Sequence, residues 1–238
     1  RPAVDLDELR RRQRCVTDFH GDSNLAEQTR ERLRSVNDLQ RILGRLRNRL
    51  ARPRELGGIL GALHQLPKLK ALFAERSDLE AAKVSDRLGT FDDLRDLLKR
   101  GLADELPSDL RDGGVIREAF DEDLDHLREL SAGGKTWLSE LEESEREKTG
   151  IKNLRIKYNG AFGYFIEVSK SNIPLVPEHY VRKQTLTNVE RYFTEELQQK
   201  EKEILNAEER AIACEEEIFR ELVEAALAEA EDLSETAA

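Results

Sequence analysis

The stretch that decides the fold reads Leu154-Arg155-Ile156-Lys157-Tyr158-Asn159-Gly160-Ala161-Phe162-Gly163-Tyr164-Phe165-Ile166-Glu167-Val168. Before the central Asn-Gly, Leu154, Ile156 and Tyr158 alternate with the basic Arg155 and Lys157. After it, Tyr164, Ile166 and Val168 alternate with Phe165 and Glu167. This two-residue period is the spacing of β-strands. Asn-Gly is the strongest short signal for a hairpin turn. Two strands joined by a turn are therefore predicted here, and a further strand is expected over 181–187.

Helical spacing lies on both sides of this β segment. Leucines recur from Asp121 to about Thr149 and predict one long helix, which Gly150 should end. The helical period returns at about Thr194 and persists to about Asp232, with apolar or small pairs every seven residues that need a partner helix. The simplest arrangement pairs these two helices antiparallel, with the β segment at their far tip.

Shorter helices are expected before residue 120, because apolar residues recur there at helical spacing between turn and cap signals. The predicted fold class is therefore mainly α, with long antiparallel helices and a small antiparallel β unit inserted at their tip. The expected early helices are 4–19, one capped by Asn24, one starting near Asn37 or Asp38, one starting at Pro53, a separate short one from Pro67 to Phe73, and one at about 91–99.

The composition agrees with this class. The chain has 238 residues, of which 37% are charged and only 5% aromatic, a balance typical of helices with long solvated faces and not of a β-sandwich. No run of apolar residues is long enough for a transmembrane helix, and no secretory leader is visible. The start at Arg1-Pro2 and the absence of Met suggest a piece of a longer or processed protein. Two isolated cysteines indicate reduced thiols in a cytosol.

The net charge of −10 conceals a basic segment. Residues 194–238 are strongly acidic, whereas residues 151–193 carry an excess of basic side chains. An acidic protein that binds a polyanion has to use such a local patch, although ordinary surface is the alternative interpretation. The basic residues of the segment are Lys152, Arg155, Lys157, Lys170, Arg182, Lys183 and Arg191, against Glu167, Glu178 and Glu190.

The sequence contains no signature of an enzyme. The Gly-Lys-Thr run at 134–136 lacks the earlier glycine of a phosphate-binding loop, because Glu129 stands at that position. The acidic residues at 121, 123 and 125 lack the later ligands of a calcium loop and are interpreted as an acidic first turn of a helix. The four histidines have no metal-ligand spacing, and no nucleophile has a local signature. We predict no catalytic residue, no metal site and no cofactor in this chain.

A specific resemblance covers most of the chain. It is carried by Gly150-Ile151-Lys152-Asn153-Leu154-Arg155-Ile156-Lys157-Tyr158-Asn159, Phe162-Gly163-Tyr164-Phe165-Ile166-Glu167-Val168-Ser169-Lys170, Leu175-Val176-Pro177, the run from Tyr180 to Tyr192, and Glu196-Leu197. These runs resemble the clamp region of the MutS family of bacterial DNA mismatch repair proteins. Upstream, Arg1-Pro2, Pro53-Arg54-Glu55-Leu56 and Gly113-Gly114-Val115-Ile116-Arg117 resemble the helical core, or lever, of the same family.

The resemblance implies three parts: a helical core and lever at 1–149, a β-rich DNA clamp at 150–193, and a returning lever helix at 194–238. It also implies that two protomers surround double-stranded DNA and hold its backbone without reading bases, while the levers relay the state of an ATPase domain. The implied partners are a second copy of the full-length protein and a MutL-type protein, with no membrane, in a cytoplasmic, nucleoid-associated setting. ATP and Mg²⁺ belong to the full-length family, whose ATPase and mismatch-reading domains have no counterpart here.

Duplex holding needs cations and amide or hydroxyl donors that face phosphates. The matching clamp positions are Ser169, Lys170, Arg182, Lys183, Gln184, Thr185 and Asn188. At position 187 this chain has threonine where many relatives carry lysine, which removes one possible phosphate contact.

The role of two further basic residues stays open. Arg155 and Lys157 share a strand face and either extend the basic patch or solvate the outer side of the sheet. The aromatic residues Tyr158, Phe162 and Tyr164 are expected in the small core rather than stacked on bases.

The alternative function is a helical interaction module whose stripe at 197–226 docks a partner helix, with no intrinsic DNA binding.

Overall fold

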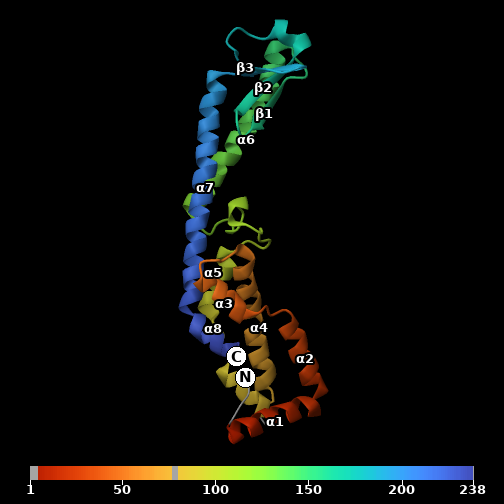
Figure 1. Cartoon of the computed structure of the whole chain (residues 1–238), viewed down its shortest axis with the longest axis vertical. Coiled ribbons are helices and arrows are strands. Elements are labelled where there is room, and N and C mark those ends of the chain that lie inside the picture. Colours follow the sequence, from red (N-terminus) through yellow and green to blue (C-terminus); the bar gives the residue numbers. More distant parts are fainter. Residues whose placement is uncertain (1–4, 77–79, 238) are drawn as a thin grey trace. The chain divides into compact units, whose positions relative to one another are not determined.

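The computed structural model describes residues 5–76 and 80–237 and divides into two compact units. The first comprises Arg1–Phe120 with Glu215–Ala238, and the second comprises Asp121–Cys214 (Figure 1). The chain is mainly helical with one small antiparallel sheet, so the predicted fold class is confirmed. Within the described ranges no helix is both long and apolar enough to cross a membrane, and no group of side chains has a metal-binding arrangement.

The first unit consists of helices. Buried aliphatic side chains at helical spacing, such as Leu56, Ile59 and Leu63 on one helix, pack these elements together. Its elements are α1 (Leu6–Gly21), α2 (Ser23–Arg34), α3 (Leu39–Arg47), α4 (Pro53–Ala74), η1 (Glu80–Arg87), α5 (Asp92–Gly101), η2 (Leu110–Asp112), the end of α7 (Glu195–Ala228) and α8 (Ala230–Thr236).

Aspartate side chains start two of the short helices. The Asp38 carboxylate accepts the backbone N–H of Arg41 at 3.0 Å at the start of α3, as predicted. The expected cap at Asn24 is wrong, because the Asp22 carboxylate accepts the N–H of Leu25 at 2.9 Å and starts α2 two residues earlier. Asn24 therefore lies in the first turn of α2.

The predicted break at Pro67 is also wrong, since α4 runs unbroken from Pro53 to Ala74. Proline inside a helix loses one backbone hydrogen bond and crowds the preceding turn. The buried stripe nevertheless continues through it, with Leu63 and Leu66 before and Leu69 after. Burial of this stripe outweighs the local penalty of the proline.

The second unit places a four-stranded antiparallel sheet at the end of a helix pair. Its elements are α6 (Glu122–Thr149), β1 (Arg155–Asn159), β2 (Gly163–Ser169), η3 (Lys170–Leu175), β3 (Val181–Thr185), β4 (Val189–Phe193) and α7 up to Cys214. The strand order is β1-β2-β4-β3. The strand β4 was not expected from the sequence, whereas the other three strands and the hairpin at Asn159–Gly163 were.

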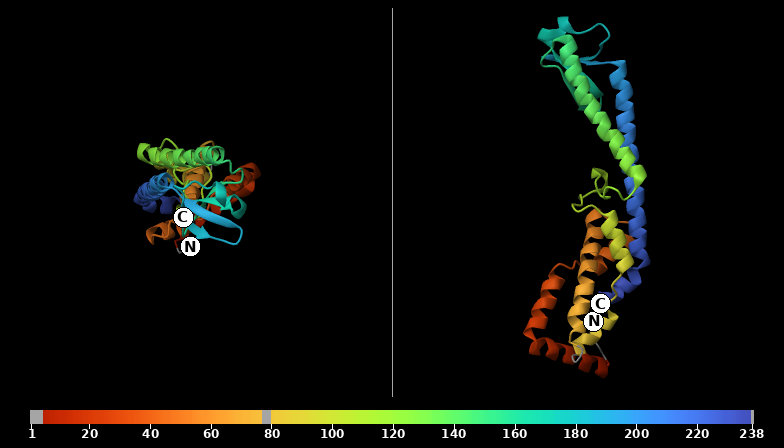
Figure 2. Two further views of the ribbon diagram at one scale, coloured as in Figure 1. Left: turned by 90° about the horizontal axis from the view of Figure 1, so that it is seen from above. Right: turned by 180° about the vertical axis from the view of Figure 1, so that it is seen from behind.

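Helix α6 and the first part of α7 run antiparallel, as predicted (Figure 2). Ser131 and Lys135 of α6 both contact the Glu208 carboxylate of α7, at 3.2 and 2.7 Å. The acidic first turn expected at 121–125 is present, and the Asp121 side chain accepts the Leu124 N–H at 2.8 Å. Gly150, with φ of 72°, ends α6 as expected.

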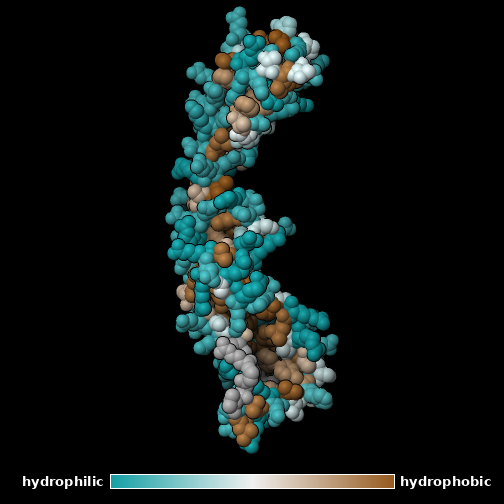
Figure 3. Space-filling view, viewed as in Figure 1, coloured by the Kyte–Doolittle hydropathy of each residue, from teal (hydrophilic) through white to brown (hydrophobic). Residues whose placement is uncertain are grey.

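One apolar core joins the helix pair to the sheet. Leu138 and Leu141 of α6, Ile166 of β2 and Leu197 and Ile204 of α7 belong to one buried cluster. The visible face of the second unit is predominantly hydrophilic, whereas the visible face of the first unit also has an apolar hollow (Figure 3). The core thus fixes which face of the sheet turns toward the helices and which turns away.

Candidate nucleic-acid interface

Two separate segments meet at one end of the sheet. The backbone N–H of Lys170, just after β2, donates to the carbonyl oxygen of Asn188 in the β3–β4 hairpin at 3.1 Å. Ser169 pairs in register with Val189. The predicted positions 169–170 and 188 are therefore neighbours in space, with the Lys170 and Asn188 side chains exposed. This junction brings together the two runs that the resemblance singled out.

A cluster of amide and hydroxyl groups surrounds Ser169. Asn153 donates its side-chain N–H to the Ser169 Oγ at 3.0 Å, and Asn172 donates to the Asn153 Oδ1 at 2.7 Å. The hydroxyls of Ser169 and Ser171 lie 3.2 Å apart. Groups of this kind commonly contact DNA phosphates and position a protein on the backbone. Sequence reasoning missed Asn153, because no local motif shows that the 150–154 loop returns to this strand end.

Arg182 and Thr185 of β3 both face Glu190 of β4. The Glu190 side chain is only 8% exposed, and its Oε1 lies 3.6 Å from the Arg182 Nη1 and 3.3 Å from the Thr185 Oγ1. The Tyr192 hydroxyl donates a hydrogen bond to the other oxygen. This bond, with the nearby Arg182 and Lys170 charges, lowers the pKa of Glu190 despite burial. Burial and the same hydrogen bond raise the pKa of Tyr192 to about 12.

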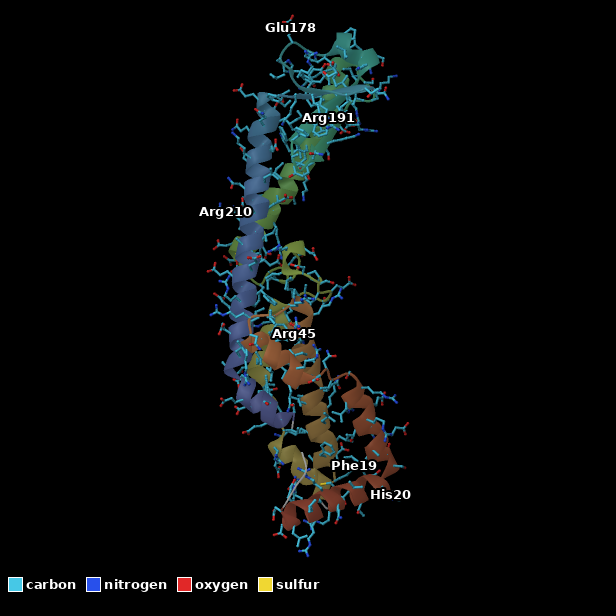
Figure 4. All side chains as sticks on the ribbon, viewed as in Figure 1. Phe19, His20, Arg45, Glu178, Arg191 and Arg210 are labelled. Atoms are coloured by element: carbon cyan, nitrogen blue, oxygen red, sulfur yellow. The ribbon has the colours of Figure 1, made fainter. Side chains whose placement is uncertain are left out.

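Gln184 lies on the opposite face of the sheet from Arg182. Its Oε1 accepts an N–H of Arg191, a residue labelled in Figure 4, at 2.9 Å. The Arg191 guanidinium sits 4.3 Å from the centre of the Phe165 ring. The ladder between β3 and β4 is irregular between Arg182 and Gln184. Such a bulge redirects the side chains that follow it.

Lys183 lies at this irregularity and is turned toward aromatic neighbours. Its ammonium donates to the carbonyl oxygen of Phe162 and lies 5.6 Å from the centre of the Phe193 ring. The seven predicted residues therefore do not form one face. Ser169, Lys170 and Asn188 meet at the strand ends, Arg182 and Thr185 surround Glu190, and Lys183 and Gln184 have separate contacts.

Arg155 and Lys157 are engaged in ion pairs with carboxylates. Arg155 lies 3.1 Å from Glu142 of α6, and Lys157 lies 2.7 Å from Glu167 of the adjacent strand. Both basic side chains are more than half exposed. Neighbouring carboxylates thus compensate part of the charge of both basic side chains. This favours the interpretation that Arg155 and Lys157 solvate the outer side of the sheet.

The three aromatic residues near the turn differ in burial. Tyr164 packs against the core as predicted. The core prediction is wrong for Tyr158 and Phe162, which are 52% and 43% exposed. Tyr158 lies next to Tyr164 with ring centres 4.9 Å apart, so it covers the rim of the core rather than entering it.

Comparisons with known proteins agree on one family. Residues 119–210 match the family model described as MutS family domain IV. The DNA mismatch repair protein MutS of Lachnoclostridium phytofermentans is 38% identical over 236 residues, which cover 99% of this chain and 25% of that protein. The protein of the same name from Halalkalibacterium halodurans is 43% identical over 228 residues, 94% of this chain and 26% of that protein. The chain thus spans about a quarter of the length of the curated relatives it matches.

Proposed function

Since this chain belongs to the MutS family of DNA mismatch repair proteins, we propose that its second unit holds double-stranded DNA through the sugar–phosphate backbone without reading base sequence. The observation that carries this proposal is the junction of Lys170 with Asn188, which gathers exposed cationic and neutral donors from two segments at one sheet end. Phosphate contacts position a protein on a duplex and carry no sequence information directly.

The contacting residues are proposed to be Ser169, Lys170, Arg182, Lys183, Gln184, Thr185 and Asn188, in two roles. Lys170 and Arg182 have exposed charged groups and would supply most of the salt-dependent attraction. The remaining polar side chains would fix the position of the backbone. Lys183 and Gln184 would first have to exchange their present contacts with Phe162 and Arg191.

The roles of the longer protein are part of the same proposal. Two copies of it would surround the duplex, and the antiparallel helices α6 and α7 would relay the state of an ATPase domain to the sheet. The matched family model is domain IV, so ATP and Mg²⁺ would bind elsewhere in the longer protein and this chain would carry no catalysis of its own. A MutL-type protein would be a partner of the longer protein.

The rival function, a helical module that docks a foreign helix, is weakened by what covers the stripe on α7. In the second unit Leu197 and Ile204 are buried in the core shared with α6. In the first unit Leu222 is 2% exposed and lies against Gly101 at the end of α5. These parts of the apolar stripe are therefore covered by elements of the chain itself, whereas Ile212 between them is 37% exposed.

The test is binding of the 238-residue chain to a labelled, fully matched duplex across a salt series. A Lys170→Glu/Arg182→Glu/Lys183→Glu variant should lose most binding. Each phosphate neutralised contributes about −0.9 to the slope of log K against log salt, so a shallower slope is expected for any residual binding.

A matched control reverses the same number of charges in the first unit, at the exposed residues Lys68, Lys99 and Arg111. This control should bind nearly as the unaltered chain does. Equal losses in both variants would show that only net charge matters and would contradict the proposed interface.

A further inference from the structure

Glu190 is a buried carboxylate beside Arg182 and Thr185, two of the residues proposed to bind phosphates. It lies within reach of Arg182, and Lys170 is close enough to influence its ionisation. A negative charge beside phosphate-binding cations weakens their attraction for a polyanion. Its presence needs an explanation that the proposed function alone does not supply.

The surroundings hold this carboxylate in place. The Tyr192 hydroxyl binds one oxygen, and the Thr185 hydroxyl binds the other. The side chain is 8% exposed, and the strand carrying it is paired on both sides, with Val168 and with Thr185. Glu190 cannot swing away when a phosphate approaches.

Arg182, in contrast, is free to move. Its side chain is 65% exposed, and its nearest contact with Glu190, at 3.6 Å, is longer than a hydrogen bond. An ion pair of this length, in which the arginine is mostly exposed to solvent, is weak and easily exchanged. The guanidinium can therefore leave the carboxylate for a phosphate that comes to the outer edge of β3.

We propose that Glu190 is an internal competitor of the DNA phosphate: it holds Arg182 while the site is empty and limits how tightly Arg182 grips the backbone when the site is filled. This inference rests on the proposed function and adds to it a limit on the affinity for the DNA backbone. A carboxylate fixed in this position keeps DNA binding weak enough for the duplex to be released.

The first experiment is the Glu190→Gln variant, whose amide oxygen can still accept a hydrogen bond from Tyr192 or Thr185. Removing the charge should tighten binding to a matched duplex roughly two- to fivefold at low salt, the range expected for loss of one weak ion pair. The slope of log K against log salt should become more negative by up to about 0.9, because Arg182 then neutralises a phosphate fully.

The matched control is Glu167→Gln, which removes an equally large charge from the other face of the same sheet, where Glu167 pairs with Lys157 and Arg191. It should tighten binding much less. A double-mutant cycle with Arg182→Gln isolates the pair: the gain from Glu190→Gln should vanish when Arg182 is absent. An equal gain in the control, or a gain that survives without Arg182, would overturn the inference.

A measurement on the unaltered chain covers the case in which Glu190→Gln does not fold. In a nuclear magnetic resonance titration with duplex, the Arg182 Nε–H signal and the Glu190 carboxylate carbon signal should move together. Movement of neither while DNA binds would exclude the exchange yet leave backbone binding intact. Absence of any salt-dependent binding would instead contradict the proposed function itself.

Discussion

The buried carboxylate of Glu145 connects α6 to the segment before β3 in the second unit. It lies on α6, is 6% exposed, and accepts a hydrogen bond of 2.6 Å from the hydroxyl of Tyr180, which precedes β3. Lys148 pairs with its other oxygen at 2.9 Å. Burial disfavours the charged form, but the bonds from Tyr180 and Lys148 prevail and lower the pKa of Glu145.

Tyr180→Phe is expected to destabilise the chain by about 1–3 kcal/mol, since it leaves part of a buried carboxylate without its donor. The free energy of unfolding in urea measures this change. Tyr158→Phe is the matched control, because that side chain is 52% exposed, and should alter the value by less than about 0.5 kcal/mol. Similar free energies of unfolding for both variants would show that the hydrogen bond between Tyr180 and Glu145 does not stabilise the chain.

The lowered pKa of Glu145 also predicts a pH dependence. A carboxyl whose pKa falls on folding stabilises the native state at pH values above its unfolded pKa, here 4.5. That contribution is lost as the pH falls through the lower, folded value. The unfolding free energy should therefore decrease below about pH 5, and less steeply in Tyr180→Phe. An identical pH slope in both proteins would contradict this assignment.

Glu215 plays a comparable part in the first unit. Its carboxylate is 3% exposed and accepts the backbone N–H groups of Gly114, Val115 and Ile116 at 3.1, 2.6 and 2.7 Å. The positive φ angles of Gly113 and Gly114, 69° and 78°, turn these groups toward one point. The contact anchors the loop before residue 120 to α7.

Glu215→Gln should destabilise the chain by about 2–3 kcal/mol, because one amide oxygen cannot replace two charged oxygens that bind three donors. Glu217→Gln, on an exposed position of the same helix, provides the control and should be nearly neutral. Thermal unfolding followed by circular dichroism compares the two. Equal melting temperatures for both variants would show that the loop does not depend on this carboxylate.

At the scale of elements, two adjacent glycines of α6 have opposite roles. A Cβ atom on Gly134 would overlap the Ile204 side chain of α7, whereas one on Gly133 would meet nothing within 4 Å. Glycine inside a helix ordinarily lowers the stability of the helix relative to alanine. The close approach of the two helices explains why glycine is needed at Gly134 alone.

Gly134→Ala should therefore destabilise the chain by about 1–3 kcal/mol through overpacking, while Gly133→Ala should stabilise it by up to about 1 kcal/mol through helix propensity. Urea unfolding measures both. Adding Ile204→Ala to Gly134→Ala should cost less than the sum of the single changes, since it removes the overlap. Stabilisation by both alanines would contradict the close packing of α6 and α7.

The elements that the sequence predicted well are those with long, regular patterns. Helix α6 combines a leucine stripe with a cap at Asp121 and a stop at Gly150, so its bounds were nearly right. Strand β4 was missed because its alternation places the charged Glu190 on the buried face. The break expected at Pro67 failed because tertiary burial overrode a local preference.

At the scale of the whole molecule, the resemblance located the candidate interface but not its internal pairing. The neighbourhood of Lys170 and Asn188 follows from strand order, which local patterns do not determine. The pairing of Arg182 with Glu190 depends on an irregular register between β3 and β4. The division into the two units is likewise a property of tertiary contacts, and the three-part division at 149 and 193 stays a prediction about functional parts.

Backbone holding by the second unit is tested most directly by mapping where a duplex contacts the 238-residue chain. Backbone amide signals are followed by nuclear magnetic resonance during titration with two matched duplexes of unrelated sequence. If the second unit holds the DNA backbone, both duplexes should cause the same perturbations, concentrated at 169–172 and 182–188. Perturbations confined to the first unit, or a pattern that changes with base sequence, would contradict it.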